Sequence, residues 1–276
     1  MIDRYINNEI SSIWNDQNRF NTWKLVQEKF VETLEHLNIA EKGVSKKIRN
    51  TEVSKEEVYK QEEITNHDLA SFVDILQKKV GDGSHWIHYG LTSSDVVDTS
   101  NSVLIMESID TVTELINNLL TTLKDKAIEE KDTSIIGRTH GVYAEETFLG
   151  NIFGNWYLEI QRSLKRIENS RNNIAIGKLS GPVGNHSVVT EEMEKLTLEK
   201  LNLKPEIFAN QIVSRDRYAE VVSSLGILAS TYERIATNIR SYQRSEISEM
   251  FEAFKDGQKG SSAMPHKKNP IGSERI

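Results

Sequence analysis

The 276-residue chain contains no cysteine and has no excess of basic residues. Without cysteine, disulfide bonds and thiolate metal ligands are excluded, and the composition suits a reducing compartment. We therefore expect a cytoplasmic location. The 34 Lys and Arg residues stand against 41 Asp and Glu, which gives a formal net charge of −7. Because non-specific nucleic-acid binding needs a basic face, this charge argues against a nucleic-acid partner.

Long apolar runs are also missing, and proline is scarce. No segment approaches the roughly 18 consecutive apolar residues that a membrane-spanning helix needs, so we expect no membrane partner. The chain has 4 prolines, and the first of them is Pro182. Since proline interrupts helices, the long proline-free stretch before it favours a largely helical protein.

Three segments carry apolar residues at the helical spacing of three or four. Their seams are Ile105, Ile109, Val112, Ile116, Leu119 and Leu123; Leu149, Ile152, Trp156, Ile160, Leu164 and Ile167; and Tyr218, Val221, Leu225, Leu228, Tyr232, Ile235, Ile239 and Tyr242. We expect the third seam to continue to Met250 and Phe254, and Asp98 or Thr99 to cap the first helix. The predicted helices have about 30 to 38 residues, or roughly 45 to 57 Å at 1.5 Å per residue.

Such long helices with wide apolar faces need more neighbours than one chain offers. We therefore infer an all-α fold with a long-helix bundle that other subunits complete, and hence a homo-oligomer. Residues 1–95 differ, because their helical stretches are short and separated by polar breaks. These stretches run from Arg19 to Leu37, Lys55 to Glu63 and Asn66 to Lys79. We predict an N-terminal helical domain at 1–95 and a central bundle domain at 96–276.

The segment Gly260–Pro270, with the sequence GSSAMPHKKNP, concentrates polar side chains of several kinds. It holds two hydroxyls, one imidazole, two ammonium groups and one amide. Gly257 and Gly260 permit backbone conformations that other residues disfavour, while Pro265 and Pro270 prevent a continuous helix. We interpret the segment as a loop that places a serine beside fixed positive charge, where an anion is held. A mobile, solvated surface loop is the alternative interpretation.

Other polar clusters lie at predicted helix ends, at 66–68, 88–95 and 138–141. Each has a structural interpretation: the first two can be helix caps, and His140 can be a hydrogen-bonded loop histidine. Together with the Gly260–Pro270 segment they indicate an anion-binding cleft with a candidate acid and base. The sequence shows no HExxH motif and no carboxylate-rich calcium loop, so we expect no metal. Acid–base chemistry on an anion without a metal favours elimination or isomerisation.

The Gly260–Pro270 segment resembles the signature loop of the fumarase/aspartase superfamily. Four further features narrow the resemblance to the bacterial type of adenylosuccinate lyases, and together they cover the whole chain. They are Asn-His-Asp at 66, Thr-Ser-Ser-Asp at 92, Gly-Arg-Thr-His-Gly at 137, and Gln211 with Arg4 and Tyr5. The resemblance implies an all-α homotetramer whose active sites are each built from three subunits, and it implies no cofactor. It also implies the elimination of fumarate from adenylosuccinate, giving AMP, and from SAICAR, giving AICAR, in purine biosynthesis.

The resemblance also implies roles for single residues. Ser261 is the expected general base, with Ser262 as a weaker candidate because the serine is doubled, and His140 is the expected general acid. The expected substrate-binding residues are Arg4, Tyr5, Asn66, His67, Asp68, Thr92, Ser93, Gln211, Lys267 and Asn269. Among these, Lys267, Asn269, Thr92 and Ser93 are expected at the carboxylates, and Arg4, Tyr5 and His67 at the phosphate and nucleotide end. His88 and Glu274 are expected as supporting residues.

Members of the family continue well beyond position 276, so we expect this chain to be a fragment that lacks a C-terminal domain. Two alternatives stay open. Another lyase of the superfamily, such as argininosuccinate lyase, would share the loop and differ at the nucleotide end. A non-catalytic helical fragment would leave the loop merely solvated.

Overall fold

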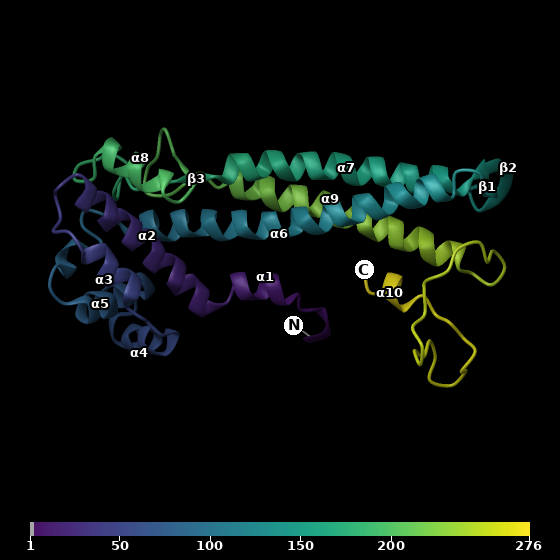
Figure 1. The fold of residues 1–276 in the computed structure, drawn as a ribbon, viewed down its shortest axis with the longest axis horizontal. Coiled ribbons are helices and arrows are strands. Elements are labelled where there is room, and N and C mark those ends of the chain that lie inside the picture. The colour runs from purple at the N-terminus through teal and green to yellow at the C-terminus, as the bar shows by residue number, and fades with distance from the viewer. Residues whose placement is uncertain (1–2) are drawn as a thin grey trace. The chain divides into compact units, whose positions relative to one another are not determined.

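The computed structural model describes residues 3–276 and contains two compact units. The first comprises Met1–Val112 with Asn169–Ala219, and the second comprises Thr113–Glu168 with Glu220–Ile276. Three long helices each supply residues to both units: α6 (Ser93–Glu129), α7 (Leu149–Ile174) and α9 (Asp216–Tyr242), seen in Figure 1. The predicted boundary near residue 95 stays a prediction. No helix in residues 3–276 is long and apolar enough to cross a membrane.

The first unit is built mainly from short helices. They are η1 (Asp3–Tyr5), α1 (Asn8–Ile13), α2 (Asp16–His36), α3 (Val44–Asn50), α4 (Lys55–Thr65), α5 (Asp68–Val80), η2 (Ser84–Trp86) and α8 (Glu191–Glu199), with the parallel strand pair β3 (Ile176–Gly177) and β4 (Lys204–Pro205). Phe20 lies 5.2 Å from Trp23 and 6.1 Å from Phe72 between ring centroids, and all three are buried. These rings join α2 to α5, because aromatic pairs add edge and stacking contacts to the apolar burial.

The start of α6 differs from the predicted cap at Asp98 or Thr99, which is therefore wrong. The helix begins five residues earlier than Asp98, at Ser93, and the Asp95 carboxylate accepts the Thr92 backbone N–H at 2.9 Å. Asp98 lies inside the helix and is buried. Its carboxylate accepts hydrogen bonds from the Arg215 guanidinium at 3.0 and 3.1 Å and from the Val213 N–H at 2.8 Å. The Asp98 carboxylate, which we predicted to cap the helix, instead forms an ion pair with Arg215, a residue distant in sequence.

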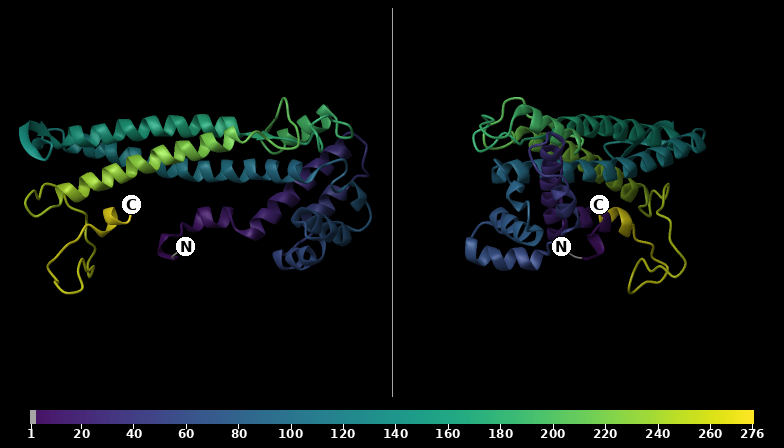
Figure 2. Two further views of the ribbon diagram at one scale, coloured as in Figure 1. Left: turned by 180° about the vertical axis from the view of Figure 1, so that it is seen from behind. Right: turned by 60° about the vertical axis from the view of Figure 1, so that its left-hand side comes forward.

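The second unit holds most of the helical bundle, in which parts of α6, α7 and α9 lie side by side (Figure 2). The helix α6 has the predicted length, with 37 residues, but α7 and α9 are shorter than predicted, with 26 and 27. In particular, α9 ends at Tyr242 and does not reach Met250 or Phe254. The cause lies just after its end, where the Gln243 side chain binds two backbone groups of the following loop.

A β-hairpin that the sequence analysis did not predict joins α6 to α7. Its strands β1 (Ser134–Thr139) and β2 (Val142–Phe148) pair antiparallel, with Thr139 opposite Val142. The two turn residues, His140 and Gly141, have φ angles of 56° and 78°. Positive φ at both positions matches the right-handed twist of a two-residue hairpin. The all-α class is confirmed apart from the two small sheets, and a short helix α10 (Ile271–Glu274) follows the Gly260–Pro270 segment.

Candidate functional site

The Gly260–Pro270 segment, called the signature loop below, returns on itself in the second unit. A Cβ built on Gly260 would lie 2.4 Å from the Lys267 carbonyl oxygen and 2.8 Å from the Asn269 nitrogen. The two ends of the loop therefore approach each other so closely that no side chain fits between them. Next to this neck, the Ser261 hydroxyl oxygen accepts the backbone N–H groups of Ala263 at 3.4 Å and Met264 at 3.3 Å. The candidate serine thus lies at the start of a turn, facing two donors.

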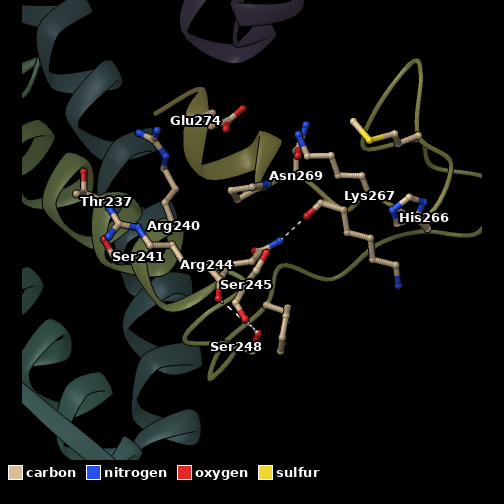
Figure 3. Close-up of a pocket in the computed structure, with 15 residues that line it drawn as sticks. Thr237, Arg240, Ser241, Arg244, Ser245, Ser248, His266, Lys267, Asn269 and Glu274 are labelled. Atoms are coloured by element: carbon tan, nitrogen blue, oxygen red, sulfur yellow. Dashed lines mark hydrogen bonds between the residues drawn. The ribbon is translucent and has the colours of Figure 1, made fainter. Parts of the chain in front are cut away.

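A cleft of about 910 Å³ lies between the signature loop and the last turns of α9 (Figure 3). Its lining residues are Thr237, Arg240, Ser241, Gln243, Arg244, Ser245, Ser248, Phe251, Met264, His266, Lys267, Lys268, Asn269, Pro270 and Glu274. Four of these carry a permanent positive charge, and Glu274 is the one carboxylate among these described lining residues. The cleft is therefore strongly electropositive in a chain whose formal charge is −7, which suits an anionic ligand.

Side chains from the loop after α9 hold the signature loop in place. The Gln243 amide donates to the Lys268 carbonyl at 2.8 Å and accepts the Glu252 N–H at 3.0 Å. The Glu252 carboxylate accepts the N–H groups of Gly272 at 3.0 Å and Ser273 at 2.6 Å, at the start of α10. The segment from Lys268 to Ser273, which carries Asn269 and directly follows Lys267, is therefore fixed by polar contacts to Gln243 and Glu252.

The hairpin that carries His140 is attached to the same connection, residues 243–252, through Glu249. The Arg138 guanidinium donates two hydrogen bonds to the Glu249 carboxylate, at 2.7 and 2.8 Å, and lies 5.3 Å from the Tyr143 ring centroid. The side chains of Arg138 and Glu249 are mostly buried, with 16% and 19% of their surface exposed. Such a bidentate pair fixes orientation as well as distance. His140 itself lies exposed at the tip of the hairpin, two residues from Arg138.

In the first unit, His67 connects α5 to the start of α6. It is the N-cap of α5, and its Nδ1 accepts the Ala70 N–H at 3.4 Å. The neutral ring then carries its proton on Nε2, which lies 3.4 Å from the Ser93 hydroxyl oxygen. Asn66 precedes it in the left-handed conformation, and the Asp68 carboxylate lies 3.5 Å from the His67 Nδ1. The structure thus brings Asn66, His67, Asp68 and Ser93 close together, and their substrate-binding role stays a prediction.

His88 is held by Gln27, a fully buried side chain that the sequence analysis did not identify. The Gln27 oxygen accepts the His88 backbone N–H at 2.9 Å, so its amide nitrogen faces the His88 Nδ1, at 3.0 Å. Because an amide nitrogen only donates, Nδ1 accepts and the ring is neutral with its proton on Nε2. Burial and, to a smaller extent, the nearby His67 lower the pKa of His88 to about 4.

We predict that His88 makes the protein less stable in mild acid. Its ordinary pKa near 6.5 applies in the unfolded chain, so acidification protonates the unfolded state before the folded one. The free energy of unfolding should therefore fall by about 2 kcal/mol from this residue between pH 7 and pH 5. Urea unfolding at the two pH values measures it. In His88→Gln this part of the pH dependence should disappear, whereas in His36→Gln, a change at the exposed C-terminal turn of α2, it should persist.

A buried ion pair lies directly behind the Thr92–Ser93 corner. The Lys178 ammonium donates to the Asp95 carboxylate and, at 2.6 Å, to the Gly181 carbonyl, and both charged side chains are fully buried. Asp95 also accepts the N–H groups of Thr92 at 2.9 Å and Gly181 at 3.1 Å. Burial raises the pKa of Asp95, and these donors oppose the rise. One carboxylate thus ties the start of α6 to the glycine-rich segment around Gly181.

The predicted site residues are divided between the two units. The first unit holds Arg4, Tyr5, Asn66, His67, Asp68, His88, Thr92, Ser93 and Gln211, and the second holds His140, Ser261, Ser262, Lys267, Asn269 and Glu274. In the second unit Lys267, Asn269 and Glu274 line the cleft, Ser261 lies at the neck of the loop, and Ser262 is exposed. Arg4, Tyr5 and Gln211 are exposed in the first unit. No group of three or more His, Asp or Glu side chains within residues 3–276 is placed to hold a metal ion.

Sequence reasoning missed the residues that position these groups: Gln27, Arg138, Lys178, Gln243, Glu249 and Glu252. Most of them contact residues far away in sequence, so spacing along the chain carries no signal for the contact. Lys178 had a weak signal, because it is a charged residue within the apolar and glycine-rich stretch 176–181.

Comparison with known proteins identifies the class to which this fold and cleft belong. A family model described as Lyase matches residues 7–276, so the chain belongs to this lyase family. Within it, the chain is 44% identical to an adenylosuccinate lyase from Aquifex aeolicus, over 100% of the chain and 64% of the relative. It is 42% identical to an adenylosuccinate lyase from Thermotoga maritima and 40% identical to one from Helicobacter pylori, again over the whole chain. The chain spans about 64% of the length of these curated relatives.

Solved structures agree on the fold. The 3-carboxy-cis,cis-muconate lactonizing enzyme from Pseudomonas putida superposes with a TM-score of 0.86 at 22% identity, over 96% of this chain and 61% of that one. A fumarate lyase from Mesorhizobium superposes with a TM-score of 0.82 at 19% identity, over 88% and 59%. At such identities the likeness bears on architecture, and it confirms the predicted long-helix bundle.

Proposed function

We propose that the protein is an adenylosuccinate lyase, which releases fumarate from adenylosuccinate to give AMP and from SAICAR to give AICAR. The observation that carries this proposal is the 40–44% identity to adenylosuccinate lyases along the whole chain. The electropositive cleft beside Ser261 supports it, since both substrates carry a dicarboxylate. We further propose that the protein acts in the cytoplasm as a homotetramer and that its reaction needs no cofactor.

In the proposed reaction, Ser261 removes a proton from the succinyl carbon next to the carbon–nitrogen bond. The electron pair left behind forms the carbon–carbon double bond of fumarate, and the carbon–nitrogen bond breaks. His140 protonates the departing nitrogen, so that the base gains one proton and the acid loses one. A serine is a weak base, but the Ala263 and Met264 N–H groups that donate to its oxygen favour its charged form. We assign the same effect to the Lys267 ammonium of the same loop.

The proposed binding roles follow the resemblance residue by residue. Lys267 and Asn269 hold the succinyl carboxylates, with Thr92 and Ser93 at a carboxylate as well. Arg4, Tyr5 and His67 contact the phosphate and nucleotide end, and Asn66, Asp68 and Gln211 complete the substrate contacts. His88 supports His67 as a neutral neighbour, and Glu274 orients a His140 from a neighbouring subunit.

A substrate panel tests the proposal on the complete encoded protein. Fumarate release from adenylosuccinate, SAICAR and argininosuccinate is measured side by side. We expect turnover of the two nucleotide substrates and none of argininosuccinate, because the latter offers no phosphate to Arg4 and His67. A preference for argininosuccinate would assign the chain to a different lyase of the superfamily. Neither turnover nor calorimetric binding of any of the three would favour a non-catalytic helical protein.

A further inference from the structure

Two arginines at the end of α9 line the cleft and have no role in the mechanism above. Arg240 lies in the last turn of the helix with Thr237 and Ser241 on the same face, since residues three and four apart are neighbours. Arg244 lies two residues beyond the last helical residue, Tyr242. All four side chains line the cleft on the side opposite Lys267 (Figure 3). The last turn of α9 and the residues just after it thus present two guanidinium groups and two hydroxyl groups to the same space.

These arginines differ from most others in the chain, which are neutralised by carboxylates. Arg19, Arg49, Arg138, Arg171, Arg215, Arg217 and Arg234 each form an ion pair. Within residues 3–276, neither Arg240 nor Arg244 has a carboxylate within 4.0 Å as an ion-pair partner. Lys267, across the cleft, has no such partner either. Acidic residues outnumber basic ones, 41 to 34, so the absence of partners here is not a shortage of carboxylates.

The arrangement also has an energetic cost. Like charges that line one cleft repel each other. Cations near a helix C-terminus do stabilise it, which explains Arg240 in the last turn of α9. Arg244 beyond the helix end, with Lys267 and Lys268 lining the same cleft, adds repulsion that a bound anion would offset. The geometry therefore favours a ligand with more than one negative charge.

We propose that Arg240 and Arg244 form a carboxylate subsite, which with Lys267 and Asn269 binds the dicarboxylate part of the substrate and the fumarate product. This inference rests on the proposed function, because the dicarboxylate is the part that reacts. The planar guanidinium matches a carboxylate in a bidentate pair, and the Ser241 and Thr237 hydroxyls can donate to its remaining lone pairs. The subsite fixes the anionic end of the substrate while the loop serine acts on the adjacent carbon.

The test uses Arg240→Gln, Arg244→Gln and the double variant in the complete encoded protein. Arg166→Gln is the matched control, since Arg166 is an exposed arginine on α7 that does not line this cleft. Fumarate binding is measured by calorimetry, independently of turnover, and KM and kcat are measured with adenylosuccinate. We expect the Kd for fumarate and the KM to rise about tenfold to a hundredfold in each single variant, the loss typical of one charge-assisted pair. The Kd for AMP should change less than twofold in the Arg240 and Arg244 variants. In the control Arg166→Gln, the Kd for fumarate and the KM should also change less than twofold.

The outcomes separate the two proposals. Unchanged fumarate binding and KM in an active enzyme would overturn the subsite and leave the proposed function intact. Weakened binding of AMP or inorganic phosphate with unchanged fumarate binding would also overturn it, because the arginines would then serve a phosphate. Arginine-dependent fumarate binding without turnover of any nucleotide substrate would support the subsite and contradict the proposed function. Circular dichroism on each variant shows that the helices are retained.

Discussion

Replacing Lys178 by methionine is expected to lower the free energy of unfolding by about 3 to 5 kcal/mol, among the largest effects of any single substitution in this chain. The substitution leaves the Asp95 carboxylate fully buried with two backbone N–H groups and no cation. An unpaired buried charge retains its desolvation cost and loses the attraction that opposed it. Urea unfolding at neutral pH, followed by circular dichroism, measures the loss.

Two further variants show whether the pair itself is responsible. Asp95→Leu combined with Lys178→Met removes both charges, and we expect it to recover most of the lost stability, as apolar replacements of buried pairs often do. Lys195→Met, an exposed lysine on α8, should change the stability by less than about 0.5 kcal/mol. If Lys178→Met were as mild as Lys195→Met, the ammonium of Lys178 would not be the partner that keeps Asp95 buried.

Replacing Ser261 by alanine is expected to reduce turnover of adenylosuccinate by about a hundredfold to ten-thousandfold, while the fold and the KM change little. General-base catalysis contributes about 10² to 10⁴ in rate, and alanine has no group that can take the proton. The hydroxyl contributes two weak hydrogen bonds to the turn, at 3.3 and 3.4 Å, so its loss should be structurally mild. Fumarate release in the complete encoded protein, with unfolding curves alongside, gives both quantities.

Ser262→Ala is the comparison that resolves the doubled serine. Ser262 is exposed, and Ser261 is the hydroxyl that the Ala263 and Met264 N–H groups face. We therefore expect Ser262→Ala to lose less than tenfold in turnover. A thousandfold loss in Ser262→Ala with a mild effect in Ser261→Ala would reverse the assignment of the base.

The sequence predicted the fold where the signal is local. Apolar spacing located all three long helices, and the short helices of the first unit fall close to their predicted ranges. The misses arise where distant residues compete with local preference. Apolar residues at Met250 and Phe254 continue the α9 pattern, yet Gln243 binds the backbone at Lys268 and Glu252 and ends the helix. The strands at 134–148 form a hairpin where the sequence analysis expected only a loop between two helices.

In the candidate site, too, the sequence indicated residues with a local signal and missed those whose contacts are distant in sequence. The residue types of the signature loop indicated an anion site, and the resemblance assigned the carboxylates to Lys267 and Asn269. Both line the electropositive cleft, and their role stays a prediction. Arg240 and Arg244 were not singled out, because an arginine at the end of a long helix is ordinary until the structure shows that it lacks an ion-pair partner. Gln27 was missed for a similar reason, since its hydrogen bonds to His88 span 61 positions.

Gln243, Glu249 and Glu252 give a means of altering catalysis through residues to which no substrate contact is assigned. Gln243 and Glu252 hold the segment that bears Lys268 and Asn269, and Glu249 holds the hairpin that bears His140. Substitutions at Gln243 or Glu252 would displace the carboxylate ligands, and substitutions at Glu249 would displace the proposed acid. Libraries aimed at the rate or temperature optimum of such an enzyme should therefore sample these three positions before the conspicuous polar side chains, where most changes abolish the chemistry outright.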